Sequence, residues 1–426
     1  MKRPAKFQLN GIDYLMLGFD HELRRAGLAG NQCQILLELE SPIDAGLLEQ
    51  RLRHLGERYP LIASRRTGGF HPSWISDPSA LCRLQVRRHP FEPDLAERLF
   101  NEPLHTRQGE LIRLDLWEDP AGHASLSFTW AHALMDAPGA EWFLALLGHE
   151  DLPLPAAPEP VLPRSPLSLP QRFRTARKNL VQIDEFCQAA PRSLGTRLPA
   201  ARRGRMRYRV EEFSAEETSR VSEHAMRLCG ALGEARYHAA VALVELHRLH
   251  GQLGRDTPSY VLPIPVGLRP KGSAEPLFRN QVTMLMTQIM PEHLRSVPDT
   301  VTRLRSQIEQ GLRDALVESG QVAGDLFRCL PLPIYMAILK RGLRGEICSL
   351  FYGDTAAVNP LLTRFMGSPV RHFTHAAAVT PSPGIGVIFY TFGGRLRMTV
   401  LHLSNVLSEE QAAGFAAAIK ARLLAP

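Results

Sequence analysis

The stretch Ala124–Ala140, ASLSFTWAHALMDAPGA, governs the interpretation of the rest of the sequence. Its first half alternates apolar and polar residues, and this pattern predicts a half-buried strand. A helix is expected to begin at Pro138, because proline fits the first helical turn. His132 and Asp136 therefore lie where a strand passes into a helix, a place from which side chains often reach a cleft.

These two residue types suit proton transfer. A histidine whose pKa lies near neutrality can take a proton from a hydroxyl or amine that attacks a carbonyl group. Asp136, four residues after His132, would shape the loop and fix the ring. The spacing alone also allows a plainer interpretation, in which His132 is a buried polar residue at a strand end and Asp136 simply favours a helix N-terminus.

Strand and helix patterns alternate in the first third of the chain. A strand is predicted at Gln32–Glu40, a helix at Asp44–Tyr59 and a further strand around Ile112–Leu116. Prolines and basic residues then accumulate from Leu152 onwards, which indicates a crossover between domains that contains one helix at Gln171–Gln188.

The second half begins again with a strand near Met206–Phe213 and a helix capped by Ser214 and Glu217. Near the end, Gly393-Gly394 separates two apolar runs and predicts a hairpin. With 426 residues, two domains are the expectation. The predicted division is an N-terminal lobe at 1–151, a linker at 152–205 and a C-terminal lobe at 206–426.

The segment Phe128–Ala140 resembles the active-site motif of the chloramphenicol-acetyltransferase-like superfamily. That superfamily includes peptide-synthetase condensation domains, polyketide-associated acyltransferases and wax ester synthase/diacylglycerol acyltransferases. Its shared pattern is His-His-x-x-x-Asp-Gly at the end of a strand in the N-terminal lobe. The resemblance implies that His132 is the catalytic histidine and that Asp136 is the aspartate of the motif.

Other segments resemble the superfamily in order and rough spacing, so the resemblance covers nearly the whole chain. It implies an α/β fold (an α+β sandwich) of two chloramphenicol-acetyltransferase-like lobes, arranged as a V. Each lobe would hold a mixed, largely antiparallel sheet flanked by helices. The matching segments are Ile12 to Asn31, Leu37 to Glu40, Leu47 to Leu55, Tyr59 to Ile62, Val261 to Pro270 and Asn280 to Thr283.

Arg269 receives its role from the same resemblance. In condensation domains, an arginine in the matching second-lobe segment pairs with the aspartate of the motif across the lobe boundary. Arg269 is therefore the expected partner of Asp136, in an ion pair that guanidinium geometry favours. The alternative is an ordinary surface arginine that follows a strand.

The sequence departs from the superfamily pattern at several positions. Ala131 replaces the first histidine of the pair, Ala137 replaces the glycine after the aspartate, and Arg279 precedes Asn280 where relatives often have glycine. The C-terminal Asp-Phe-Gly-Trp-Gly motif of the plant enzymes is missing, so that branch is not expected. These departures keep open an alternative function, a catalytically silent binding module that recognises an acyl carrier or a lipid-like ligand.

The resemblance implies direct acyl transfer from an acyl thioester to a hydroxyl or amine, forming an ester or amide, with His132 as general base. The donor would be acyl-CoA or a phosphopantetheinyl acyl carrier protein, and no permanently bound cofactor is expected. No metal is expected either, because the pairs His372/His375 and His247/His250 have no third ligand in view.

The net charge is +7, and much of the excess lies in Arg164–Lys178 and Arg192–Arg209. The second stretch could meet the phosphates of coenzyme A or the acidic face of a carrier protein, or be a solvated linker. No nucleic-acid-binding signature accompanies it. The apolar segment Leu326–Ile347 is either a wall for a long acyl chain, a membrane-surface patch, or a core helix broken by prolines.

A cytoplasmic location is expected, with peripheral membrane contact as an alternative. No apolar run approaches the length of a membrane span, and no apolar stretch follows the basic residues at Lys2-Arg3. The two-lobed relatives are often monomers, and a monomer is the expected state here. The cysteines are scattered as reduced thiols would be, at Cys33, Cys82, Cys187, Cys229, Cys329 and Cys348.

Overall fold

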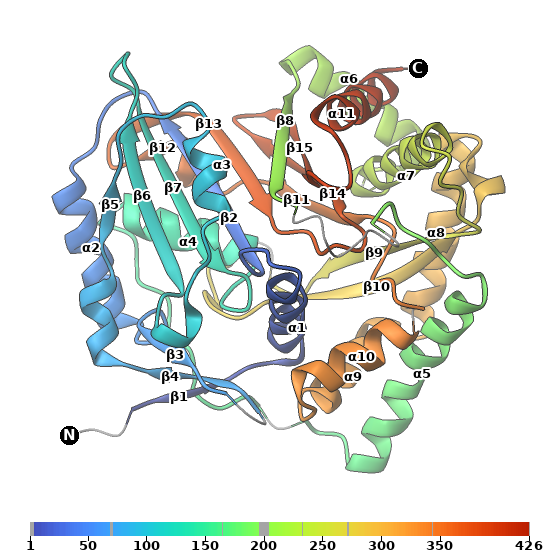
Figure 1. Cartoon of the computed structure of the whole chain (residues 1–426), viewed down its shortest axis with the longest axis horizontal. Coiled ribbons are helices and arrows are strands. Elements are labelled where there is room, and N and C mark those ends of the chain that lie inside the picture. Colours follow the sequence, from blue (N-terminus) through green and yellow to red (C-terminus); the bar gives the residue numbers. More distant parts are fainter. Residues whose placement is uncertain are drawn as a thin grey trace.

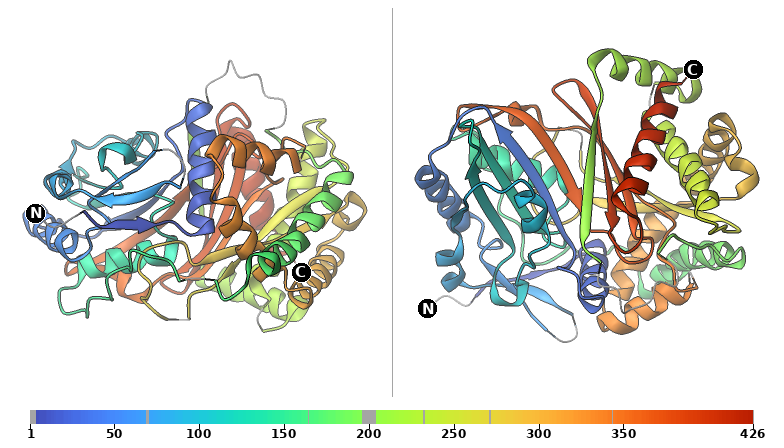
Figure 2. Two further views of the ribbon diagram at one scale, coloured as in Figure 1. Left: turned by 90° about the horizontal axis from the view of Figure 1, so that it is seen from below. Right: turned by 45° about the horizontal axis from the view of Figure 1, so that its top comes forward.

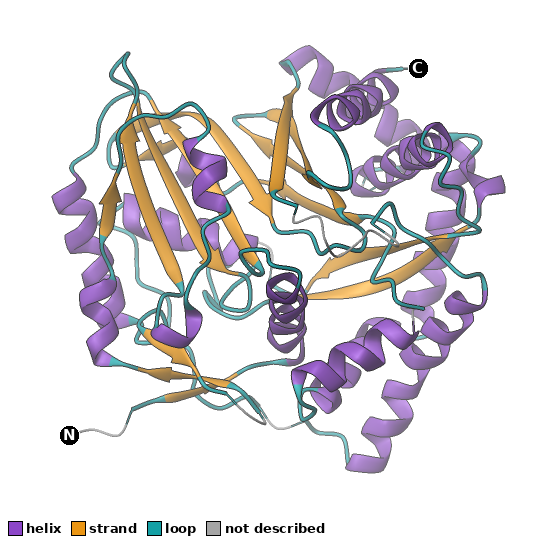
Figure 3. Cartoon of the chain, in the orientation of Figure 1, coloured by secondary structure: helices purple, strands orange, loops and turns teal. Residues whose placement is uncertain are grey.

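The computed structural model describes residues 4–68, 71–163, 165–195, 204–231, 233–270, 272–342 and 344–425. These residues form two lobes that lie beside each other, each built around its own sheet (Figures 1 and 3). The fold is of the mixed α/β class, with two large clusters of buried apolar side chains. Among the described residues, no helix is both long and apolar enough to cross a bilayer.

The first lobe contains a six-stranded sheet that is antiparallel except at the β5–β6 edge. Its central strands are rich in β-branched, aromatic and leucine side chains that face the core on both sides, so few of their residues are exposed. In spatial order the strands are β12 (Arg364–Phe365), β13 (Ser368–Ala377), β2 (Gln32–Leu39), β7 (Ala124–Ala131), β6 (Ile112–Glu118) and β5 (Val86–Arg88).

Two strands of this first sheet come from the second half of the chain. β13 pairs antiparallel with β2, with His375 opposite Ile35. The side chain of His375 is buried, and its Nε2 lies 2.9 Å from Oε1 of Glu141 on helix α4 (Ala137–Gly148). The predicted range 206–426 for the second lobe is therefore too simple, because β12 and β13 complete the sheet of the first lobe. An open edge of β2 would leave its backbone groups unpaired, and β13 supplies their partners.

Helices cover the first sheet and a small second sheet lies beneath it. The ring of Phe143 on α4 stacks on Phe128 of β7 with centroids 5.5 Å apart. The small sheet has the order β1 (Lys6–Gln8), β4 (Ser73–Ser76) and β3 (Ser64–Arg66). The helices of this lobe are α2 (Ala45–Arg58), α3 (Leu95–Phe100) and α4 (Ala137–Gly148), with 3-10 turns η1 (Pro78–Arg83) and η2 (Thr106–Gln108).

The second lobe has a four-stranded sheet and a two-stranded hairpin. The sheet has the order β11 (Phe351–Ala357), β14 (Ile385–Phe392), β15 (Arg395–Leu403) and β8 (Met206–Glu212), and the hairpin pairs β9 (Tyr260–Gly267) with β10 (Val282–Ile289). Helices pack around them, as Figure 2 shows. They are α6 (Ala215–Cys229), α7 (Glu234–Gln252), α8 (Val297–Arg313) and α11 (Glu409–Leu424), with η3 (Pro291–Leu294) and η4 (Pro360–Thr363) in connections.

Helix α1 (Gly11–Arg25) stands between the lobes (Figure 1). Below it lie α5 (Leu169–Gln188), α9 (Leu316–Phe327) and α10 (Leu332–Gly342). The predicted helix at Gln171–Gln188 is confirmed as α5. Glycines at Gly11 and Gly324 let α1 and α9 approach closely, because a Cβ on Gly11 would lie 2.5 Å from the Gly324 carbonyl carbon.

Local signals in the sequence match the elements that form. The Ser214–Glu217 capping box is complete at the start of α6. Asp44 caps α2 by accepting hydrogen bonds from two backbone N–H groups. The turn between β14 and β15 holds Gly393 and Gly394 at φ values of 57° and 74°, as the two-residue hairpin requires.

Candidate active site

His132 follows directly after β7, whose last residue, Ala131, pairs with Gln32 at the start of β2. The backbone N–H of His132 donates to the carbonyl oxygen of Asn31 at 3.0 Å. This bond continues the strand pairing for one residue beyond the sheet. The position of His132 is therefore set by two central strands of the first lobe.

Asp136 is the N-cap of α4, and both of its carboxylate oxygens are occupied. Oδ1 accepts from the Gly139 N–H at 2.9 Å and from Nη2 of Arg269 at 2.8 Å, while Oδ2 accepts from the Gln281 N–H at 2.8 Å. Its side chain is only 8% exposed. Asp136 thus shapes the loop after β7 and does not hydrogen-bond the ring of His132.

The structure brings Arg269 and Asp136 together across the boundary between the lobes. Arg269 follows β9 in the second lobe, and its side chain is 9% exposed. Its Nη1 also donates to the carbonyl oxygen of Pro276, which holds the segment after β9 in a tight loop. A buried charge pair of this kind stabilises one arrangement of the two lobes because either charge alone would be strongly disfavoured.

Asn280 joins the His132 loop to α1. Its Nδ2 donates to the carbonyl oxygen of His132 at 2.8 Å and to Oδ1 of Asp13 at 2.9 Å. The backbone N–H of Asn280 donates to the same Asp13 oxygen at 2.9 Å. Asp13 is fully buried, and burial raises its pKa to about 6. The His132 loop is therefore fixed from α1 and from the second lobe at once.

Arg279 is one of the positions at which the sequence departs from the superfamily pattern, and its backbone conformation is unusual for arginine. Its φ of 73° lies in the left-handed region, where relatives' glycine would be favoured. The backbone N–H of Arg279 donates to the carbonyl oxygen of Leu134 at 2.8 Å, and Arg279 forms an isolated parallel bridge with Met135. The contact with the loop after β7 thus holds a backbone conformation that arginine seldom adopts.

Burial disfavours the charged form of the His132 imidazole. Its Nδ1 is enclosed and has no hydrogen-bond partner within the described residues. Burial lowers the pKa of His132 below the ordinary histidine value, while the charge of Asp136 and the carbonyls of His132 and Met135 oppose this without reversing it. A neutral imidazole can accept a proton, which is what a general base requires.

Comparison with solved structures places this geometry in a known architecture. The trichothecene 15-O-acetyltransferase of Fusarium sporotrichioides superposes with a TM-score of 0.71 at 13% identity, covering 99% of this chain and 96% of that chain. The first condensation domain of the calcium-dependent antibiotic synthetase, in complex with a substrate analogue, gives 0.70 at 16% identity, with 99% and 96% covered. The protein has the condensation-domain fold.

A third structure with this fold is polyketide synthase associated protein 5 from Mycobacterium tuberculosis, with a TM-score of 0.64 at 14% identity over 99% of this chain and 98% of that chain. These structures match two of the three superfamily branches named from the sequence, condensation domains and polyketide-associated proteins. The wax ester synthase branch stays an expectation from the sequence. No family model and no curated protein matches the chain.

A basic cavity of about 550 Å³ lies beside the His132 loop of this condensation-domain fold. Arg24 of α1, Arg66 of β3 and Arg107 of η2 line it, and Asp20 is the one acid among its lining residues. Asp20 pairs with Arg24 at 2.9 Å, so Arg66 and Arg107 leave an excess of positive charge. The Nε of Arg66 is buried and has no hydrogen-bond partner within the described part of the chain.

The basic cavity is connected to the His132 loop by two hydrogen bonds. Oδ1 of Asp20 accepts from the Asn31 N–H at 3.1 Å, and Asn31 in turn accepts from the N–H of His132 at 3.0 Å. Asp20, which lines the cavity, is thus linked through Asn31 to the backbone of His132. The cavity was not predicted from the sequence, because Arg24, Arg66 and Arg107 come from separate elements.

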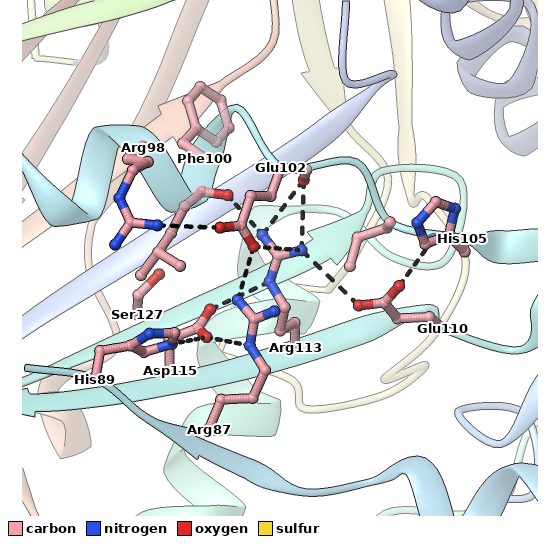
Figure 4. A network of polar contacts seen from close by, with 12 residues as sticks. Arg87, His89, Arg98, Phe100, Glu102, His105, Glu110, Arg113, Asp115 and Ser127 are labelled. Carbon is pink, nitrogen blue, oxygen red and sulfur yellow. Dashed lines mark hydrogen bonds and ion pairs between the residues drawn. The ribbon is translucent and has the colours of Figure 1, made fainter.

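A polar network on the first sheet holds the loop that carries Arg107 (Figure 4). The buried carboxylate of Asp115 accepts from Arg87 Nε at 2.6 Å and from Arg113 Nε at 3.2 Å. Arg113 also donates to the carbonyl oxygen of Glu102, and Glu110 accepts from the N–H of His105 at 3.0 Å. The network fixes both ends of the loop 102–110, and with it η2.

The other candidate groups have partners of their own. His375 contacts Glu141, His372 contacts Glu212 at 2.9 Å, His247 contacts Tyr260 at 2.9 Å and His250 contacts the Arg255 carbonyl. Within the described residues, no cluster of three His, Cys, Asp or Glu side chains could hold a metal ion.

The basic stretch Arg192–Arg209 is only partly described, since residues 196–203 lie outside the described ranges. Arg207 forms an ion pair with Glu97, and Arg209 pairs with Glu211 at 3.0 Å. The charges of these two arginines are therefore matched within the protein. In the basic cavity, by contrast, Arg66 and Arg107 form no salt bridge within the described residues.

We expect Arg269→Ala to lower the free energy of unfolding by about 3–5 kcal/mol, because it leaves a buried carboxylate without its counter-charge. In an Asp136→Asn background, the same substitution should cost much less. Urea denaturation of the four proteins of this cycle measures the coupling. Arg305→Ala, which breaks the exposed pair with Glu309, is the control and should leave stability unchanged. If the loss of stability in the double variant equalled the sum of the losses in the two single variants, the Arg269–Asp136 pairing would be contradicted.

We also expect His132 to titrate below the ordinary histidine pKa of about 6.5. An unfolded chain would protonate His132 near that value, so this group stabilises the fold above pH 6.5 and loses its contribution as the pH falls below it. NMR titration of histidine-labelled protein measures the pKa, and His132→Gln assigns the signal by its loss. A signal titrating at or above 6.5 would show that the ring is well solvated.

Proposed function

We propose that the protein is an acyltransferase that moves an acyl group from a thioester to a hydroxyl or amine, with His132 as general base. The observation that supports this most strongly is the half-buried imidazole, with an enclosed Nδ1 and a lowered pKa, on a loop held between two lobes. The donor is proposed to be acyl-CoA or an acyl carrier protein. The fold comparison supports acyl transfer in general, because one similar structure is an acetyltransferase.

The proposed reaction uses Nε2 of His132, since Nδ1 is enclosed. The acceptor O–H or N–H bond breaks as its proton moves to Nε2, and the acceptor atom forms a bond to the thioester carbonyl carbon. The carbon–sulfur bond then breaks, and the departing thiolate takes the proton from the imidazolium. His132 returns to its neutral form, so no external base and no covalent acyl-enzyme are needed.

Asp136 and Arg269 are assigned as positioning residues in this proposal. Their contacts hold the loop that carries His132 and touch no part of its ring. Asn280 has the same role through the carbonyl oxygen of His132. Loss of any of these contacts would displace the base from its acceptor, and small displacements are costly for a proton transfer that depends on geometry.

The basic cavity supports a phosphorylated donor. Coenzyme A and the phosphopantetheine arm of a carrier protein both bear phosphate groups, and planar guanidinium groups bind phosphate well. Within the described part of the chain, Arg66 and Arg107 form no salt bridge, whereas Arg24 pairs with Asp20. We propose that Arg66 and Arg107 bind a donor phosphate while the thioester extends toward His132.

The first test incubates the protein with acyl-CoA and acyl-carrier thioesters, from acetyl to long-chain, with alcohols and amines as acceptors. Acceptor-dependent release of free thiol is expected, and His132→Ala should reduce it roughly 100- to 10,000-fold. His54→Ala, at an exposed position on α2, is the matched control and should keep full activity. Tight thioester binding without release by the wild type would instead favour a silent binding module.

The second test separates phosphate recognition from chemistry. Arg66→Gln and Arg107→Gln should raise KM for an acyl-CoA on the order of tenfold, the effect of about 1.4 kcal/mol, with little change in kcat. The corresponding N-acetylcysteamine thioester carries no phosphate, and its kinetics should not respond to either substitution. Arg371→Gln, an exposed arginine on β13, is the control. Equal effects on both donors would refute phosphate binding in the basic cavity.

A further inference from the structure

A second cavity lies on the opposite side of α1 from the basic cavity. It has a volume of about 300 Å³ and is enclosed by α1, α5, α9, α10 and the β9–β10 hairpin, the elements at the lower centre and right of Figure 1. Most of its lining is apolar, and the polar exceptions are Asn179, Asp184, Thr283 and the hydroxyls of Tyr335 and Tyr352. The side chains that define it include Ile12, Leu15, Met284, Met286, Phe327 and Tyr335.

This apolar cavity has an inner end and a mouth. Thr283 and Ala323 line the inner end and are 1% and 5% exposed, whereas Leu180 of α5 and Ile338 of α10 line the mouth and are 40% and 44% exposed. Asn280 donates a hydrogen bond to the carbonyl oxygen of His132, and Thr283 lies three residues further along the chain. Along the backbone, this places the inner end of the cavity about 10 Å from Asn280. The inner end of the cavity therefore lies three residues from Asn280, which contacts the His132 loop, and the mouth opens between α5 and α10.

Gly320 of α9 widens the cavity. A Cβ at this position would lie 3.5 Å from Thr283 Oγ1 and 3.8 Å from Asn179 Nδ2, which is ordinary contact. Its backbone is helical and has no positive φ, so neither the fold nor the packing requires glycine. Glycine is nevertheless less favourable than alanine inside a helix. Its effect here is to leave space between Thr283 and Asn179.

Helix α5, which lines one side of the apolar cavity, is held by hydrogen bonds to its neighbours. The N–H of Asn179 donates to Ser319 Oγ at 2.9 Å, and that hydroxyl donates to the carbonyl oxygen of Thr175 at 2.7 Å. Gln182 reaches the carbonyl oxygen of Met286 on β10 at 3.4 Å. Because α5 is tied to both α9 and β10, the cavity is part of the folded structure and its width is set by packed elements.

From these observations we propose that the apolar cavity holds the alkyl chain of the acyl donor, with the carbonyl end toward His132 and the methyl end toward α5 and α10. This inference rests on the proposed function. A cavity of about 150 Å³ holds benzene, so about 300 Å³ has room for an alkyl chain on the order of twelve carbon atoms. A charged or strongly polar ligand would lose hydration there that the few polar lining groups replace only in part.

The experiment measures binding without turnover, using sodium dodecanoate and isothermal titration calorimetry. Wild type and His132→Ala should bind dodecanoate with the same Kd, and acetate should not bind. Gly320→Leu, whose side chain would enter the cavity, should weaken dodecanoate binding at least tenfold. Gly414→Leu, at an exposed helical glycine on α11 with no atom near its Cβ position, is the matched control and should bind as the wild type does.

A smaller substitution, Gly320→Ala, serves as the test if Gly320→Leu does not fold. Gly320→Ala has room for its Cβ and should weaken dodecanoate more than octanoate. Absence of dodecanoate binding to the wild type, or equal binding by Gly320→Leu, would overturn the proposal. In thiol-release assays, Gly320→Leu should shift donor preference from dodecanoyl toward acetyl thioesters.

The outcome is separable from that of the proposed function. Dodecanoate binding without thiol release would support the apolar cavity as a chain-binding site and reject acyl transfer. Thiol release from acetyl thioesters with no dodecanoate binding would support acyl transfer and reject the apolar cavity as a chain-binding site.

Discussion

The carboxylate of Asp136 is the group on which the arrangement of this site depends. It is buried, and its oxygens accept from the first turn of α4, from the Gln281 N–H and from Arg269. Removing a carboxylate from water costs several kcal/mol unless its hydrogen bonds and counter-charge are replaced. The replacements come from both lobes, so the charge is stable only when the lobes meet in one way. The loop that carries His132 is held in its position because both lobes supply hydrogen bonds and a counter-charge to Asp136.

Two further connections make the lobes interdependent. β13 comes from the second half of the chain and completes the first sheet beside β2. Asn280 joins the carbonyl of His132 to the buried Asp13 of α1. Helix α1 consequently contributes side chains to both cavities, with the basic cavity on one side of the helix and the apolar cavity on the other. In the proposed function, this arrangement places a donor phosphate and a donor alkyl chain on opposite sides of one rigid helix.

The roles of His132 and Asp136 differ from those in a serine-hydrolase triad, where a carboxylate orients the imidazole and stabilises its charged form. Here both oxygens of Asp136 are used elsewhere, and burial keeps His132 neutral. An imidazolium at this position would receive little compensation for its charge. In the proposed mechanism this favours rapid passage of the proton to the departing thiolate.

The sequence by itself determined the elements that depend on neighbouring residues. Capping boxes at Ser214, the hairpin at Gly393-Gly394 and the strand-to-helix step at His132 follow from local hydrogen bonds and periodicity, and all of them form. The pairing of β13 with β2, the contact of Asp13 with Asn280 across 267 residues and the two cavities were decided only by the tertiary structure. An alternating pattern identifies a strand but carries no information about which distant strand completes its hydrogen bonds, and a cavity depends on side chains that only the path of the folded chain brings together.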